Sequence, residues 1–301
     1  MSKFSGVYTI MPTPFKDDGG LDLESLEHLT KFLVDLGVDG VVVLGVMGEA
    51  PKLSQAEQDE VIKTTVAAAG SIPVFSGSGA AGTDLAVEKS VNAISLGAQG
   101  LLVAPPPVQN DKVIFDYYSR INDAVNKTII LHDYPIATGI KMSPALVKRL
   151  YDDLEHVKVI KLEETPSIPK ITAIRNLDCD IGIVGGLGGM FFLEELKRGS
   201  DGMMTGFSYP EILVAIYNAY TSDDKGEAAR IFYDACPLLR YEFQPSIGLA
   251  LRKEVYRQRG AIASAFVRHP GTQIDEHLKG ELADVLEYCQ LEELLKKEVS
   301  A

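Results

Sequence analysis

The chain has 301 residues, 46% of them hydrophobic, which is enough for one large domain or two small ones with a substantial core. Its formal net charge of −13 argues against a nucleic-acid partner, because phosphate backbones are bound by clustered lysines and arginines. No apolar run approaches the roughly 20 residues of a membrane span, and the N-terminus lacks the apolar segment of a signal peptide, so we expect a cytoplasmic protein without a membrane partner.

A strand pattern followed by a helix pattern occurs eight times between residues 6 and 220. The strand patterns are nearly continuous runs of Val, Ile and Leu, as expected of strands that are covered on both faces. The repeat of about 30 residues is typical of βα units. In chain order, the expected strand and helix pairs are 6–11 and 22–36, 40–46 and 54–69, 72–77 and 83–96, 100–104 and 111–125, 128–134 and 143–151, 157–162 and 167–174, 181–184 and 190–197, and 202–206 and 210–220.

Eight such units predict an α/β fold, a (β/α)₈ barrel over residues 1–222. A doubly wound open sheet is the alternative, but it would need a glycine-rich phosphate loop after the first strand, where this chain has Met11-Pro12-Thr13-Pro14-Phe15. After residue 222 the pattern becomes purely helical, and we expect residues 223–301 to pack on the barrel. The expected helices there are 224–235, 246–259 and 273–297, with Pro237, Pro245 and Pro270 as helix breakers.

Cysteine usage gives no sign of a covalent or metal-bound framework. Cys179, Cys236 and Cys289 are odd in number, widely spaced and not arranged as CxxC. We expect them to be reduced packing residues, with no structural zinc site.

Lys161 is the most informative residue, because it lies at the C-terminal end of the sixth expected strand, where barrel enzymes place their active sites. Strand alternation puts Glu163 on the same face as Lys161. A lysine at a strand end is often merely solvated, but one that points into a barrel mouth is shielded from water, which increases the fraction of neutral amine. Such an amine condenses with a ketone to form an imine, and this chemistry requires no metal and no cofactor.

Two glycine-containing loops follow other expected strands. Gly45-Val46-Met47-Gly48-Glu49 follows the second, and its glycines could turn backbone N–H groups toward an anion or simply form a structural turn. Gly185-Gly186-Leu187-Gly188-Gly189 follows the seventh, and four glycines in five residues allow close approach of the backbone to a ligand.

Four motifs occur in the order and spacing of a known family: Thr13-Pro14-Phe15, Gly-x-x-Gly-Glu at 45–49, Tyr-Pro-x-x-Thr-Gly at 134–139, and Ile160-Lys161. With them the chain resembles the dihydrodipicolinate synthase/N-acetylneuraminate lyase family of class I aldolases and dehydratases over nearly its whole length. The resemblance implies a homotetramer built as a dimer of dimers, with Lys161 as the Schiff-base lysine. It also implies that Gly45, Val46, Met47 and Gly48 bind the carboxylate of a 2-oxo acid, in a pocket that Gly185, Gly186 and Met204 line as well.

The departures from the family pattern concern proton transfer and substrate choice. Val46 and Met47 occupy the positions of two threonines, so only backbone N–H groups remain to bind the carboxylate. His132 stands where the family has a catalytic tyrosine, and Pro106-Pro107 replaces an aromatic pair. Ala137 stands where dihydrodipicolinate synthases have an arginine for a second carboxylate, and alanine cannot replace a bidentate donor.

Three side chains are candidates for the missing proton relay. His132 has an ordinary pKa suited to acid–base work at neutral pH, and alternation places it on the same face as Tyr134. Glu163 is the second candidate and Tyr134 the third, whereas Asp133 is expected to point away from the pocket. The alternative for His132 is a buried ring that binds a backbone carbonyl. The alternative for Glu163 is a carboxylate that is merely solvated or paired. Arginines in the C-terminal region are expected in surface or intersubunit pairs: Arg240, Arg252, Arg257 and Arg259.

The sequence therefore predicts a class I lyase that forms a Schiff base between Lys161 and a 2-oxo acid. The reaction would cleave or dehydrate a 2-keto-3-deoxy sugar acid or a related hydroxy-keto acid. One alternative is 4-hydroxy-tetrahydrodipicolinate synthase activity, which Ala137 disfavours, and another is a catalytically retired ligand-binding barrel.

Overall fold

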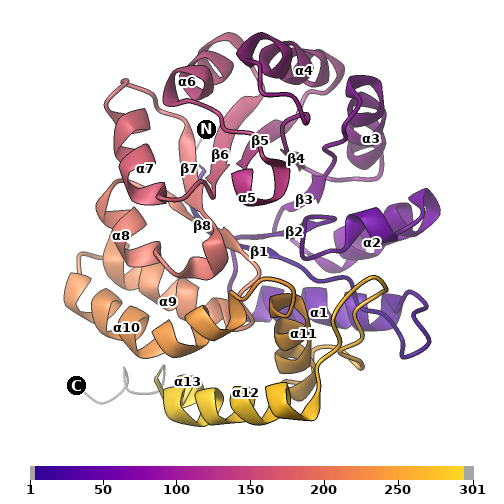
Figure 1. Cartoon of the computed structure of the whole chain (residues 1–301), viewed down its shortest axis with the longest axis vertical. Coiled ribbons are helices and arrows are strands. Elements are labelled where there is room, and N and C mark those ends of the chain that lie inside the picture. Colours follow the sequence, from indigo (N-terminus) through magenta and orange to yellow (C-terminus); the bar gives the residue numbers. More distant parts are fainter. Residues whose placement is uncertain (1–3, 295–301) are drawn as a thin grey trace.

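The computed structural model describes residues 4–294 and has a closed barrel of eight parallel strands at its centre (Figure 1). The barrel closes because β1 pairs with both β2 and β8. The predicted (β/α)₈ barrel is therefore confirmed, and the open sheet is wrong. The strands are β1 (Gly6–Ile10), β2 (Gly40–Val43), β3 (Val74–Gly77), β4 (Gly100–Val103), β5 (Thr128–Asp133), β6 (Val157–Leu162), β7 (Gly182–Gly185) and β8 (Gly202–Thr205).

Helices form a ring outside the strands (Figure 1). Their N-terminal N–H groups are often bound by the side chain of the preceding residue, as by Asp22, Ser54, Asn110 and Ser143. These caps explain why the predicted helix starts agree closely with those observed. The ring and its connections comprise α1 (Leu23–Asp35), η1 (Ala50–Lys52), α2 (Gln55–Ala68), α3 (Thr83–Ser95), α4 (Asp111–Ala124), α5 (Pro135–Thr138), α6 (Pro144–Asp153), α7 (Ser167–Arg175), η2 (Leu187–Gly189), α8 (Phe192–Lys197) and α9 (Pro210–Thr221).

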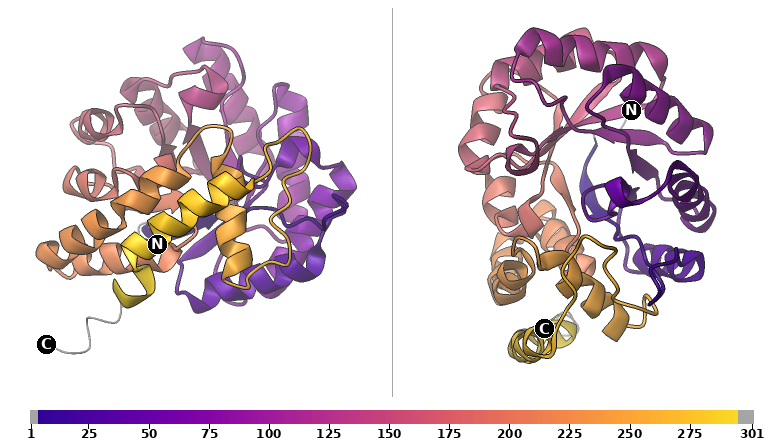
Figure 2. Two further views of the ribbon diagram at one scale, coloured as in Figure 1. Left: turned by 60° about the horizontal axis from the view of Figure 1, so that its bottom comes forward. Right: turned by 45° about the vertical axis from the view of Figure 1, so that its right-hand side comes forward.

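The C-terminal region adds α10 (Lys225–Glu242), α11 (Gly248–Gln258), α12 (Glu276–Cys289) and α13 (Leu291–Leu294). Figure 2 shows these helices along one side of the ring, where α10 lies beside α9. They share a hydrophobic cluster with α8 and α9, so the C-terminal region packs on the barrel through an apolar interface. Over residues 4–294, none of the helices has both the length and the apolar character that crossing a membrane requires.

The inside of the barrel is filled by side chains, so it is a packed core rather than a channel. This inner cluster holds at least one buried apolar residue from every strand. Over the described residues, the interior therefore leaves no channel between the two ends of the barrel, and we call the end formed by the C-terminal ends of the strands the barrel mouth. The buried members of the inner cluster are Tyr8, Ile10, Val42, Phe75, Leu102, Ile130, Val159, Val184 and Met204.

Several element ends differ from the sequence-based prediction. β2 ends at Val43 rather than Val46, because Leu44 adopts a left-handed backbone conformation (φ 56°) that turns the chain out of the sheet. α10 was expected to stop at residue 235 but continues past Pro237 to Glu242. Its buried face is apolar on both sides of the proline, and this packing outweighs the hydrogen bond that Pro237 cannot donate.

The long helix predicted over 273–297 is also wrong in its bounds. α12 begins at Glu276 and ends at Cys289, because Gln290 adopts a left-handed conformation (φ 45°) and α13 then starts as a separate short helix. Residues 295–297 of that prediction lie outside the described part of the chain.

Barrel closure is expected to depend on the absence of a side chain at Gly202. A Cβ there would lie 1.9 Å from the carbonyl oxygen of Gly6 on the neighbouring strand, and both groups are backbone. We expect Gly202→Ala to lower the free energy of unfolding by about 3 kcal/mol or more, measured by urea denaturation. Gly280→Ala in α12, where nothing lies within 4 Å of the new Cβ, is the control and should raise stability by up to ~1 kcal/mol. Equal effects of the two substitutions would contradict this account.

Candidate active site

Lys161, Glu163 and His132 form a buried triangle at the barrel mouth. The Nζ atom of Lys161 lies 2.9 Å from Oε2 of Glu163, and that oxygen lies 2.8 Å from Nε2 of His132. The third side, from Lys161 Nζ to His132 Nε2, is 3.4 Å. All three side chains are buried. They lie close together because β5 and β6 are neighbouring strands, with His132 opposite Lys161 in the register. The Glu163 carboxylate therefore links the amine and the imidazole, with each within hydrogen-bond distance of Oε2.

The surroundings of Glu163 and His132 lower the pKa of each group, and so determine which of them is charged at neutral pH. Burial disfavours the ionised form of Glu163, but the Lys161 charge and the hydrogen bond to His132 outweigh burial and hold its pKa well below the ordinary value. Burial lowers the pKa of His132, and the Lys161 charge lowers it further. At neutral pH the triangle therefore contains a carboxylate and a neutral imidazole, an arrangement suited to acid–base work.

Backbone geometry fixes the Glu163 carboxylate. Its Oε1 accepts a hydrogen bond of 2.8 Å from the backbone N–H of Leu187, which begins η2 after β7. A Cβ on Gly186 would lie 2.4 Å from the Glu163 carboxyl carbon, so glycine is needed there for the carboxylate to fit. The glycine-rich loop after β7 thus positions Glu163.

Tyr134 joins the triangle through ring stacking. The rings of His132 and Tyr134 lie 5.6 Å apart between centroids and are inclined by 11°. Burial and the Glu163 charge raise the pKa of Tyr134, while the Arg252 guanidinium acts in the opposite direction. Asp133 points the other way, as predicted, and its carboxylate lies 2.6 Å from Nζ of Lys170 on α7.

The loop after β2 presents backbone groups at the mouth. The Gly48 carbonyl accepts a hydrogen bond of 2.7 Å from the Thr13 hydroxyl, which holds the turn in place. The N–H groups of Val46 and Met47 have no hydrogen-bond partner among residues 4–294, so both can donate to an anion. The Val46 side chain is 59% exposed.

The protein's own carboxylates fill the space on the side of Gly185 and Gly186 where a side chain would lie. A Cβ on Gly185 would lie 1.8 Å from Oε2 of Glu195, a buried carboxyl group on α8. The space beside Gly186 is filled by Glu163. That the backbone of these glycines lines the pocket of a 2-oxo acid stays a prediction. Met204 is fully buried in the inner cluster beneath the mouth.

Arg252 is the residue that sequence reasoning missed. It was expected in a surface or intersubunit pair, but it is only 6% exposed, and its Nη1 lies 3.1 Å from Sδ of Met47 in the loop after β2. Periodicity could not have identified it, because α11 is buried on all sides from Ala250 to Tyr256.

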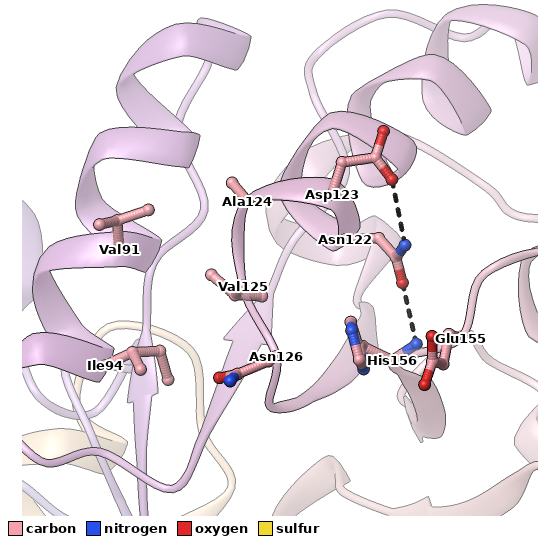
Figure 3. Close-up of a pocket in the computed structure, with 9 residues that line it drawn as sticks. All are labelled: Val91, Ile94, Asn122, Asp123, Ala124, Val125, Asn126, Glu155 and His156. Atoms are coloured by element: carbon pink, nitrogen blue, oxygen red, sulfur yellow. Dashed lines mark hydrogen bonds between the residues drawn. The ribbon is translucent and has the colours of Figure 1, made fainter.

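A surface pocket of about 550 Å³ lies at the opposite end of the barrel (Figure 3). Its lining comes from α3, the end of α4 and the residues before β6, including Asn122 and His156. Because Lys161 lies at the C-terminal end of β6, this pocket is remote from the buried triangle. The pocket carries no comparable set of buried charged groups.

Comparisons with known proteins agree with the barrel fold. The model of the dihydrodipicolinate synthetase family matches residues 3–289. A 4-hydroxy-tetrahydrodipicolinate synthase of Methanosphaerula palustris is 33% identical over 94% of this chain and 98% of that protein. An L-2-keto-3-deoxyarabonate dehydratase of Azospirillum brasilense is 29% identical over 92% of each chain. The crystal structure of dihydrodipicolinate synthase from Rhodopseudomonas palustris has a TM-score of 0.90 and 33% identity, covering 95% of this chain and 97% of that one.

The electrostatics of the triangle predict how His132 titrates. Lys161→Met removes a charge that lowers the pKa of His132, so we expect this pKa to rise in the variant. Glu163→Gln removes a partner that raises it, so the pKa should fall further below its ordinary value. Histidine ring NMR titrations would measure both shifts, with His132→Asn identifying the signal among the five histidines. A His132 signal that does not move in either variant would contradict the coupling.

Proposed function

The chain belongs to the dihydrodipicolinate synthetase family, and we propose that this lyase uses Lys161 to form a Schiff base with a 2-oxo acid. The observation that carries the proposal is the buried triangle of Lys161, Glu163 and His132 at the C-terminal ends of β5 and β6. A nucleophilic amine with an acid–base group in hydrogen-bond reach is what imine chemistry requires. We further propose a 2-keto-3-deoxy sugar acid or a related hydroxy-keto acid as the substrate.

The triangle gives each residue a role in this reaction. Lys161 attacks the ketone carbon after transferring a proton to the Glu163 carboxylate, which lies 2.9 Å from Nζ. The neutral His132 ring donates its Nε2–H to the same carboxylate over 2.8 Å and can exchange a proton with it. The oxygen of the adduct takes up the proton that the attacking nitrogen loses, which gives the carbinolamine. The proton on Glu163 then passes through His132 to the departing hydroxyl, so water leaves and the iminium forms.

The iminium activates the neighbouring carbon. Removal of a proton from C3 gives an enamine, and departure of the C4 hydroxyl, protonated to water, completes a dehydration. An aldolase would instead break the C3–C4 bond as a C4 hydroxyl loses its proton. In either case hydrolysis of the imine releases the product and regenerates Lys161. Tyr134, stacked on His132, is the proposed third proton-transfer group.

The proposed carboxylate site is the loop after β2. The N–H groups of Val46 and Met47 would bind the C1 carboxylate of the 2-oxo acid, with Gly45 and Gly48 shaping the turn. Since β2 and β6 stand opposite each other in the eight-stranded order, a 2-oxo acid attached to Lys161 can extend its carboxylate across the mouth to this loop.

Dehydration or aldol cleavage is favoured over the synthase reaction by Ala137. This exposed residue of α5 carries no group that could bind a second carboxylate. The relative from Azospirillum brasilense is named a dehydratase of a 2-keto-3-deoxy acid, which fits the proposal. Relatives named 4-hydroxy-tetrahydrodipicolinate synthase are as similar, so that activity is the second candidate.

We also propose that the enzyme is a cytoplasmic homotetramer, a dimer of dimers. Exposed apolar side chains near strand ends support association with further copies, because Val46 in the loop after β2 and Ile136 in α5 are 59% and 62% exposed. The proposed division is a barrel of residues 1–222, which holds the triangle, and a helical region of residues 223–301, which packs on it.

The nucleophile is tested by borohydride trapping. Incubation with pyruvate and borohydride should add the mass of the reduced adduct to the peptide that contains Lys161, and Lys161→Met should abolish it. Lys158→Met is the matched control, because Lys158 lies on the same strand with an exposed side chain and should leave trapping unchanged. Absence of an adduct across a panel of 2-oxo acids would exclude the Schiff-base mechanism.

The relay and the substrate class are tested by turnover. With 2-keto-3-deoxy sugar acids, His132→Asn should lower kcat by about 10²–10⁴-fold while slow trapping at Lys161 persists. His156→Asn, at the opposite end of the barrel, is the control for loss of a histidine. With pyruvate and aspartate semialdehyde, wild-type turnover should stay near background because of Ala137. Unchanged kcat in His132→Asn would make this histidine structural, and rapid turnover of aspartate semialdehyde would favour the synthase.

A further inference from the structure

We propose that Arg252 is a carboxylate-binding residue, whose terminal guanidinium nitrogens bind the C1 carboxylate of the 2-oxo acid together with the N–H groups of Val46 and Met47. The inference rests on the proposed function and extends it to a residue outside the barrel proper. Arg252 comes from α11, in the C-terminal region.

Arg252 is buried but only half satisfied. Its Nε donates to Oε2 of Glu242 over 3.3 Å, and its Nη1 contacts Sδ of Met47 at 3.1 Å. Nη2 has no hydrogen-bond partner among the described residues, although the side chain is only 6% exposed. A thioether is a weak acceptor, so the outer edge of the guanidinium lacks the strong acceptors that a buried cation needs.

Among the described residues, Glu242 hydrogen-bonds Arg252 through Nε alone, over 3.3 Å. Its oxygens also accept hydrogen bonds from the hydroxyl and the backbone N–H of Ser208. Glu242 therefore orients the Nε side of Arg252 and leaves the opposite edge able to bind an anion.

The position of the unpaired guanidinium edge of Arg252 indicates which anion it could bind. Met47 packs against the inner cluster, and a Cβ on Gly206 after β8 would lie 2.9 Å from Met47 Cγ, so this side chain lies at the mouth. Arg252 contacts Met47 there, on the side of β2 and β8. The charges of Glu163 and Arg252 shift the pKa of Tyr134 in opposite directions, since Glu163 raises it and Arg252 lowers it.

The C1 carboxylate is the substrate group that fits this place. A 2-oxo acid attached to Lys161 on β6 would direct C1 across the mouth toward β2, whose following loop carries the two N–H groups and contacts the Arg252 guanidinium. Neither Val46 nor Met47 has a hydroxyl group, so side-chain donors to the carboxylate have to come from elsewhere. A guanidinium presents two parallel N–H donors in a geometry that matches a carboxylate.

The test compares a charged and an uncharged ketone in borohydride trapping of Lys161. Arg252→Met keeps an unbranched apolar stem but removes the guanidinium, and we expect it to raise the half-saturating pyruvate concentration by about tenfold or more. Methyl pyruvate lacks the negative charge, so its half-saturating concentration should change little. Arg257→Met removes a charge from the exposed side of α11 and should leave both values unchanged. Arg252→Lys keeps the charge without the fork and should give an intermediate value.

Four outcomes would overturn the proposal. These are an unchanged pyruvate dependence in Arg252→Met, an equal loss for pyruvate and methyl pyruvate, an equal loss in Arg257→Met, or a loss confined to longer 2-oxo acids such as 2-oxoglutarate. Urea unfolding establishes that each variant is folded, and Arg252→Lys carries the comparison if Arg252→Met is not. If wild type forms no adduct, the proposed function fails, and calorimetry with pyruvate then tests Arg252 alone. Tighter binding to wild type than to the Arg252 variant would still support the carboxylate site, and equal affinities would refute it.

Discussion

The Glu163 carboxylate is the interaction on which the rest of the candidate site depends. It is removed from water and kept ionised by three partners: the Lys161 amine, the His132 ring and the backbone N–H of Leu187. Burying an isolated carboxylate costs several kcal/mol, so the loss of any one partner would leave a poorly compensated charge in the mouth. This constraint also explains the glycine at 186, because a side chain there would displace the carboxylate from all three partners. Lys161, His132 and the loop after β7 are therefore parts of one electrostatic unit.

The same principle links the C-terminal region to the loop after β2. Glu49, directly after Gly48, is buried and receives hydrogen bonds from Lys253 over 2.6 Å and from Lys52 over 2.8 Å. Burial lowers the pKa of Lys253 to about 8, whereas the Glu49 carboxylate acts in the opposite direction and favours the charged amine. Lys253 and Arg252 are neighbours on α11, and they reach consecutive parts of the loop: Lys253 binds Glu49, and Arg252 contacts Met47. The helical region after the barrel is therefore a structural part of the mouth.

The sequence predicted the parts of the molecule that depend on local pattern. Runs of branched apolar residues and helix caps gave the eight βα units, and strand alternation placed Lys161 and Glu163 on one side and Asp133 on the other. It could not predict what depends on contacts between distant segments. The burial of Arg252 and the occupation of the space at Gly185 by Glu195 are set by packing between elements far apart in the chain. The extension of α10 past Pro237 is a case in which tertiary packing outweighs a local helix-breaking signal. The geometry of the triangle likewise required the register between β5 and β6.

A buried carboxylate and imidazole place different demands on the protein than a hydroxyl relay would. Hydroxyl groups are neutral, and their burial requires only hydrogen bonds, whereas Glu163 requires cations or strong donors in every step of a reaction. In the proposed reaction Lys161 becomes an iminium, whose nitrogen keeps a positive charge beside Glu163, so the carboxylate would remain compensated after the imine forms. When the iminium is converted to the enamine, that charge is lost, and a proton held by His132 at 2.8 Å from Oε2 can replace it. A histidine at position 132 therefore suits a glutamate at position 163, because protonation of the ring supplies positive charge at the step in which the lysine nitrogen gives it up.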